Sequence, residues 1–163
     1  MKKLTLIAVA AASIYSASAI AGPEEGASEL GVYGNFSTSS DYTFVNANFT
    51  YGKFMSSKLL WNFGLGIFGI DTDAGDSTSA NALTGVTYHL NDTGSTSYFK
   101  GNVNILDLEN AGDTSSIEGF WGYKNYLNER TALFYEVGYR AYLESNFRDD
   151  EVVGNIGIVF LFN

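Results

Sequence analysis

The sequence predicts an all-β fold, an eight-stranded antiparallel up-and-down transmembrane β-barrel, and three observations support this prediction. Segments of about 9–12 residues alternate between apolar and polar side chains, which is the length and period of tilted membrane strands. Polar turns separate these segments, and after the N-terminal region no stretch approaches the about 20 apolar residues of a spanning helix. Where two neighbouring strands can be aligned as a hairpin, their uncharged faces lie on the same side of the sheet.

The clearest hairpin occupies residues 117–143 and folds back at the polar turn 127–130. If the numbers of paired residues sum to 258, the uncharged faces of both strands coincide and Glu118 lies opposite Arg140. An apolar outside and an ion-paired inside are expected of a barrel in lipid. The same register places Lys124 diagonal to Glu136. The predicted ion-pair network of the lumen consists of Lys100, Glu118, Lys124, Glu136 and Arg140.

Six further strands follow from the alternation of apolar and polar residues. They are Glu29–Ser37, Tyr42–Gly52, Leu59–Ile70, Asn81–Leu90, Tyr98–Leu106 and Val152–Phe162. Residues 71–80 show no period and are predicted to form a polar loop. Membrane barrels have short periplasmic turns and longer outer loops, so the turns at 55–58, 91–97 and 127–130 are predicted to be periplasmic. The outer connections are then 38–41, 71–80, 107–115 and 145–151.

Aromatic residues of outward parity recur near the predicted periplasmic ends of seven strands. An aromatic girdle at the membrane interface explains why these residues share both the outward face and the same height in the barrel. The predicted girdle consists of Tyr51, Trp61, Tyr88, Phe99, Tyr123, Tyr135 and Phe162.

The N-terminus has the three parts of a secretory signal peptide, which is predicted to span residues 1–19. A second small-x-small site would move cleavage to Ala21. Residues 20–28 are a short periplasmic lead, and residues 29–163 form one barrel domain. Without Lys2 and Lys3, seven basic residues oppose 18 acidic ones, so the net charge is −11 and no nucleic-acid partner is expected. The chain has no cysteine, which excludes disulfides and thiolate chemistry.

With these features the chain resembles the small eight-stranded outer-membrane β-barrels of Gram-negative bacteria, the OmpA-transmembrane-domain and OmpX-like group. The resemblance is one of pattern and covers Leu30–Phe162. The ending 157–162 is similar to the aromatic-terminated last strand that the outer-membrane assembly machinery recognises, although Asn163 follows it. The resemblance implies a monomer in the outer membrane, in contact with its lipids and lipopolysaccharide, with a lumen filled by side chains.

No catalytic residue, metal site or cofactor is predicted. His89 is the only histidine, and the topology places it near the periplasmic end, far from lipid A in the outer leaflet. Residues 71–76 resemble a calcium loop, but the glycine falls one place early and Ala82 occupies the position of the bidentate ligand. Acidic residues gather in the outer connections, so divalent cations are expected to bridge them to lipopolysaccharide phosphates.

The sequence therefore favours a non-enzymatic barrel that contributes to envelope integrity or to surface interactions. One alternative is a narrow passive pore for ions or small solutes. A second is an enzyme that modifies outer-membrane lipids. A third is a soluble lipocalin-like barrel, whose apolar face would point into the lumen instead of outward.

Overall fold

The computed structural model describes residues 22–38, 42–72, 75–92, 94–105, 115–143 and 150–162. The signal peptide predicted at residues 1–19 and both cleavage sites lie outside these ranges. Among the described residues, no helix is long and apolar enough to cross a membrane.

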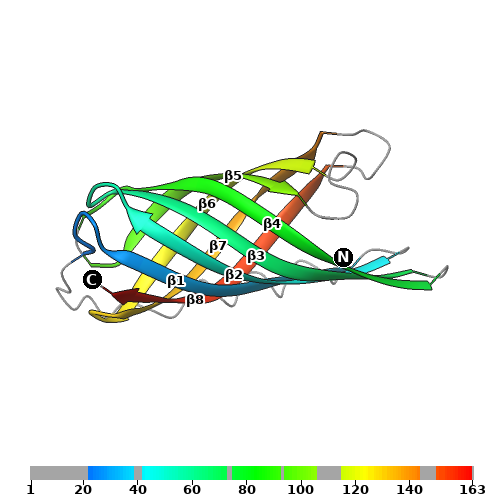
Figure 1. The fold of residues 1–163 in the computed structure, drawn as a ribbon, viewed down its shortest axis with the longest axis horizontal. Coiled ribbons are helices and arrows are strands. Elements are labelled where there is room, and N and C mark those ends of the chain that lie inside the picture. Colours follow the sequence, from blue (N-terminus) through cyan, green and yellow to red (C-terminus); the bar gives the residue numbers. More distant parts are fainter. Residues whose placement is uncertain are drawn as a thin grey trace, which may run out of the picture.

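Eight antiparallel strands form a closed barrel in which each strand pairs with its neighbours in the chain and β8 pairs with β1 (Figure 1). The all-β fold class and the strand number predicted from the sequence are confirmed. The strands are β1 (Ser28–Thr38), β2 (Tyr42–Phe54), β3 (Leu59–Thr72), β4 (Gly75–His89), β5 (Thr96–Ile105), β6 (Ser115–Asn128), β7 (Thr131–Tyr142) and β8 (Glu151–Phe162).

The two ends of the barrel differ in their connections. At one end, here called the turn end, residues 55–58, 90–95 and 129–130 join the strands, and β1 begins and β8 ends there. The opposite end, the loop end, joins β1 to β2, β3 to β4, β5 to β6 and β7 to β8. The polar loop predicted at 71–80 is wrong, because β3 and β4 remain paired as far as Thr72 and Gly75. Residues 71–80 are small and polar at nearly every position, so the periodic signal fades there while the backbone pairing continues.

The predicted register of the β6–β7 hairpin is confirmed. Glu118 pairs with Arg140, and the same register holds as far as Tyr126 and Ala132. The register then shifts by one residue, so that Asn128 pairs with Thr131 next to the turn. The alternation of the two faces therefore agrees with the register over most of the hairpin, and the residues next to the turn depart from it.

The outer wall of the barrel is apolar, whereas the lumen contains buried charged and amide side chains beside a cluster of apolar ones. Trp61 and Leu65 are 46% and 50% exposed on the wall, whereas Glu118 and Arg140 are 4% and 2% exposed. The soluble lipocalin-like alternative is therefore wrong, because it requires the face that carries Trp61 and Leu65 to point into the lumen. In the described strands, alternate residues point to opposite faces, so this inverted polarity continues around the barrel.

Inward-facing glycines make room for large side chains of the neighbouring strands. The ring of Tyr98 on β5 lies against Gly122 of β6, where a methyl group would overlap it. Gly119, three residues earlier, faces outward and has no atom within 4 Å of the place where a Cβ would stand. Glycine in the lumen is thus required by packing, because eight strands leave little interior space.

We expect Gly122→Ala to lower the free energy of unfolding by about 1–3 kcal/mol, because the added methyl group displaces the buried ring of Tyr98. Urea unfolding in lipid vesicles, followed by tryptophan fluorescence, measures this loss. Gly119→Ala is the matched control on the same strand and should leave the stability nearly unchanged. Equal losses in the two variants would contradict the packing role of Gly122.

Candidate functional site

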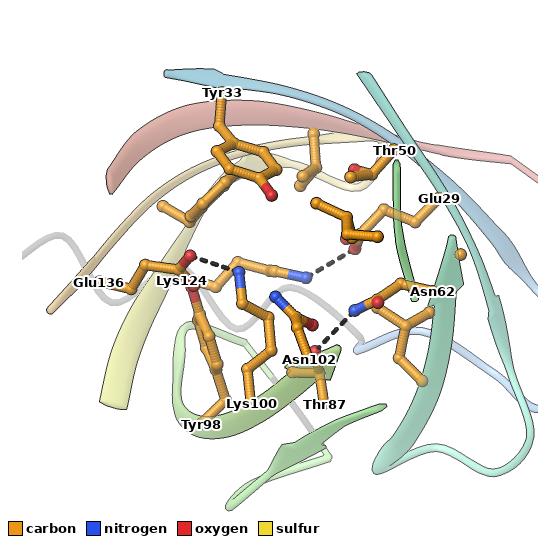
Figure 2. Close-up of a pocket in the computed structure, with 15 residues that line it drawn as sticks. Glu29, Tyr33, Thr50, Asn62, Thr87, Tyr98, Lys100, Asn102, Lys124 and Glu136 are labelled. Carbon is orange, nitrogen blue, oxygen red and sulfur yellow. Dashed lines mark hydrogen bonds and ion pairs between the residues drawn. The ribbon is translucent and has the colours of Figure 1, made fainter. Parts of the chain in front are cut away.

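Two ion pairs cross the middle of the lumen, and they join strands that are distant in the sequence (Figure 2). Lys100 on β5 pairs with Glu136 on β7. Lys124 on β6 pairs with Glu29 at the start of β1, with 2.6 Å between Nζ and Oε2. All four side chains are at most 9% exposed. The pairs therefore lie in a region of low dielectric constant, where each charge requires its partner.

Glu136 is the centre of the larger hydrogen-bond network. Besides Lys100, it accepts hydrogen bonds from the Tyr98 hydroxyl at 2.8 Å and from Asn155 Nδ2 at 2.7 Å. Asn155 Oδ1 in turn accepts a bond from Asn35 Nδ2 at 2.9 Å. One carboxylate thus connects β5, β7, β8 and β1 across the lumen.

Aromatic rings surround the Lys100 ammonium group on the sides that Glu136 leaves open. The Nζ atom lies 4.7 Å from the ring centroid of Phe120, 5.1 Å from that of Tyr33 and 5.9 Å from that of Phe134. Ring faces attract cations, and this attraction grows when water is excluded. Lys100 is therefore held as a plug in the lumen.

A second charged cluster lies closer to the loop end. Arg140 Nε donates to Glu118 Oε1 at 2.6 Å, and Arg140 Nη1 donates to Glu151 Oε1 at 2.8 Å. The Tyr142 hydroxyl also donates to Glu151, at 2.7 Å. Asn102 and Asn104 donate to Glu118 from β5, each at 3.3 Å. The guanidinium group is thus shared by two carboxylates.

All five residues predicted for the lumen network lie in the lumen, but one predicted pairing is wrong. The sequence predicts that Lys124 pairs with its diagonal neighbour Glu136. In the structure, Lys124 pairs with Glu29 instead. Lys124 and Glu136 are neighbours within the sheet, on β6 and β7. The long side chain of Lys124, however, crosses the lumen and reaches Glu29 on β1. Sequence reasoning missed Glu29 and assigned Glu151 to the outer rim. Both share the inward parity of their strands, and this signal could have identified them.

A cavity beside the two central pairs leaves about 40 Å³ for the centres of water molecules, and a water needs about 10–15 Å³ of such space. Asn62 and Asn102 line it (Figure 2), and their Oδ1 atoms accept no hydrogen bond from any described residue. Their amide nitrogens donate to Thr87 and Glu118. The cavity therefore suits a few water molecules that donate to these oxygens, and it is too small for a solute.

His89 lies in the lumen near the turn end, at the last residue of β4, and it is 1% exposed. Its ring centroid lies 5.5 Å from that of Phe54 and 5.7 Å from that of Tyr98. Its Nδ1 atom lies 3.3 Å from the carbonyl oxygen of Lys58. The imidazole is thus packed as a core residue.

The seven residues of the predicted aromatic girdle are all exposed or half-buried on the outer wall. Tyr123 and Tyr135 pair across β6 and β7, and their rings stack at 5.7 Å. Phe99 on β5 lies between Tyr88 on β4 and Trp121 on β6 in the strand registers. Neighbouring strands therefore place these rings side by side, near the turn end.

We expect Glu136→Ala to lower the free energy of unfolding by about 3–5 kcal/mol, because it leaves the Lys100 ammonium buried without its carboxylate. The double variant Lys100→Met/Glu136→Leu removes both charges and should lose clearly less. Urea unfolding in vesicles provides the measurement, with the exposed turn variant Glu129→Ala as the control. If single and double variants are equally unstable, the ion pair does not account for the loss.

No family model matches the chain, and no curated protein matches it significantly. Among solved structures, the N-terminal β-barrel domain of OprF from Pseudomonas aeruginosa is similar over 86% of this chain and 100% of that domain, with 14% identity and a TM-score of 0.59. The outer membrane protein OprG from the same organism is 11% identical over 88% of this chain and 99% of its own, with a TM-score of 0.47. The OprF likeness shows that the chain has the fold of the small Gram-negative barrels that its sequence resembles.

Proposed function

We propose that the chain is an integral outer-membrane β-barrel with a non-enzymatic role in envelope integrity or surface interactions. The observation that carries this proposal is the inverted polarity of the barrel. Its wall exposes large apolar side chains on every strand, while Glu29, Glu118, Glu136, Lys124 and Arg140 are buried inside. Soluble monomers rarely expose apolar patches beyond a few hundred Å², whereas hydrocarbon suits such a wall and a closed backbone ladder.

In this proposal the turn end faces the periplasm and the loop end faces outward. The short turns and the aromatic residues near the turn end support this orientation. The signal peptide and the aromatic last strand would direct export and recognition by the assembly machinery. Of the acidic residues assigned to the outer rim, Asp150 is exposed and Glu151 instead binds Arg140 in the lumen.

We also propose that divalent cations bridge the acidic loop end to lipopolysaccharide phosphates and that the barrel is a monomer. The acidic character of the outer connections, read from the sequence, supports the bridging. Apart from Asp150 and Glu151, the side chains of the predicted acidic rim residues lie outside what the structure describes. A closed barrel has no free lateral strand over its paired height, which supports the monomer.

The position of His89 supports the non-enzymatic proposal. Its imidazole is buried against Phe54 and Tyr98 near the turn end, so a lipid in the leaflet at the loop end does not reach it. A base must come within hydrogen-bond reach of the proton that it removes, and this geometry prevents that approach.

A narrow pore remains the second candidate, because many polar and charged side chains line the lumen. The two central ion pairs and the rings around Lys100 lie across this path, which supports the structural role. A pore would require these groups to move apart, whereas a structural barrel keeps them in place.

Leu65 tests whether the wall faces hydrocarbon, since it lies half-exposed between the girdle residue Trp61 and the loop end of β3. We expect Leu65→Arg to lower the free energy of unfolding in lipid vesicles by about 2–4 kcal/mol, the cost of a cation near the bilayer midplane. Leu127→Arg, at the turn end, is the control and should be nearly neutral. A neutral Leu65→Arg would instead indicate a wall in water.

Planar-bilayer recordings separate the structural role from the pore. For a structural barrel we expect no stable conductance steps from the wild type, and none from Glu118→Gln or Arg140→Gln. The reason is that the central pairs Lys100–Glu136 and Lys124–Glu29 still close the lumen in these variants. Steps in the wild type whose size changes in either variant would favour the pore.

A further inference from the structure

The ladder that closes the barrel is the shortest of the eight among the described residues. β1 and β8 pair only from Ser28–Phe162 to Gly34–Ile156, which is seven residue pairs. Yet β1 continues against β2 as far as Thr38, and β8 begins against β7 at Glu151. Residues 35–38 of β1 and 152–155 of β8 therefore form two strand edges with no backbone ladder between them. Figure 1 shows β8 turning away from β1 toward the loop end.

One side-chain contact spans the point where the ladder ends. Asn35 Nδ2 donates to Asn155 Oδ1 at 2.9 Å, on the lumen side of the seam between β1 and β8. This bond belongs to the network of Glu136 described above. It fixes the end of the ladder, but a single amide pair does not supply partners for the backbone groups of two open edges.

The outer face of β8 stays apolar beyond the end of the ladder. Ile156 is 68% exposed at the last pair, and Val152, four residues further toward the loop end, is 71% exposed. Gly154 lies between them and is also exposed. The apolar surface of β8 is thus longer than its backbone pairing with β1.

The length of the ladder conflicts with the thickness of a membrane. Seven pairs at about 3.3 Å per residue, tilted by about 40°, rise about 15–18 Å along the barrel axis. The apolar band of an outer-membrane barrel is about 25 Å tall. Open sheet edges do not occur facing lipid within the hydrocarbon layer, because each unpaired backbone group costs several kcal/mol there.

We propose that the membrane is locally thinned at the β1–β8 seam, so that polar lipid headgroups and their water reach the level of Gly34 and Ile156. Headgroup hydroxyl and phosphate groups and water then hydrogen-bond to the open edges of both strands. This inference rests on the proposed insertion into a membrane. A short hydrophobic stretch is known to draw the bilayer thinner around it. The wall at β2 and β3 has ladders that continue on both sides to the loop end, as far as Thr38, Thr72 and Gly75, and needs no such thinning.

The absence of cysteine in the chain makes single-cysteine labelling a direct test. Ile156 on the seam and Ile67 in the continuous wall are both exposed apolar residues, each six residues from a girdle aromatic, Phe162 or Trp61. We compare Ile156→Cys with Ile67→Cys in phospholipid vesicles, using a charged, membrane-impermeant maleimide on both sides. Val152→Cys is a second seam variant, and Phe160→Cys reports the paired region nearer the turn end.

Local thinning predicts that Ile156→Cys and Val152→Cys react at least about tenfold faster than Ile67→Cys, since headgroup water reaches only the seam. Phe160→Cys stays protected until detergent is added. Equal protection of Ile156, Val152 and Ile67, with Phe160 also protected, would overturn the thinning but leave membrane insertion intact. Rapid labelling of Phe160 and Ile67 in vesicles would overturn the membrane proposal itself. The heat-dependent shift in gel mobility verifies that each variant is folded.

Discussion

The hydrogen-bonded ladder between β1 and β8 is the contact on which the rest of the structure depends, because it turns an open sheet into a closed barrel. Closure gives every strand two neighbours and leaves only two directions for a side chain, into the lumen or out of the wall. An open sheet would leave two edges of unpaired backbone groups that invite aggregation, whereas the closed barrel satisfies its backbone groups internally over its paired height. The polarity of the wall then decides which solvent the barrel can occupy.

Closure also forces the inward-facing side chains to pack in a narrow lumen. Eight strands enclose a narrow space, so half of the side chains must fit there, and many of them are charged or amides. Glycines such as Gly122 provide room for rings, and acids pair with bases across the lumen. A buried charge without its partner is costly, so the network holds strands from opposite sides of the barrel in one arrangement. The lumen therefore acts as the core of this protein.

The two ends of the barrel differ in how completely their strands pair and how tightly their side chains pack. At the turn end, Phe54 and His89 pack together inside tightly paired strands. At the loop end, pairing stops early at the β1–β8 seam, although the strands themselves continue. The paired height is therefore uneven around the barrel. The side chains that fill the lumen, together with the uneven wall, support the proposed role of a barrel that acts through its contacts with the envelope.

The sequence by itself determined the strand number, the alternation of faces and the register of the β6–β7 hairpin, because these depend on a period of two residues and on neighbours in the chain. It also placed Lys100, Lys124 and Arg140 in the lumen by parity. Only the tertiary structure decided that Lys124 pairs with Glu29, since that contact joins β6 to β1 across the lumen. The extent of the β3–β4 hairpin and the short β1–β8 ladder were likewise beyond the sequence. Backbone pairing carries no side-chain period, and barrel closure depends on the tilt of all eight strands together.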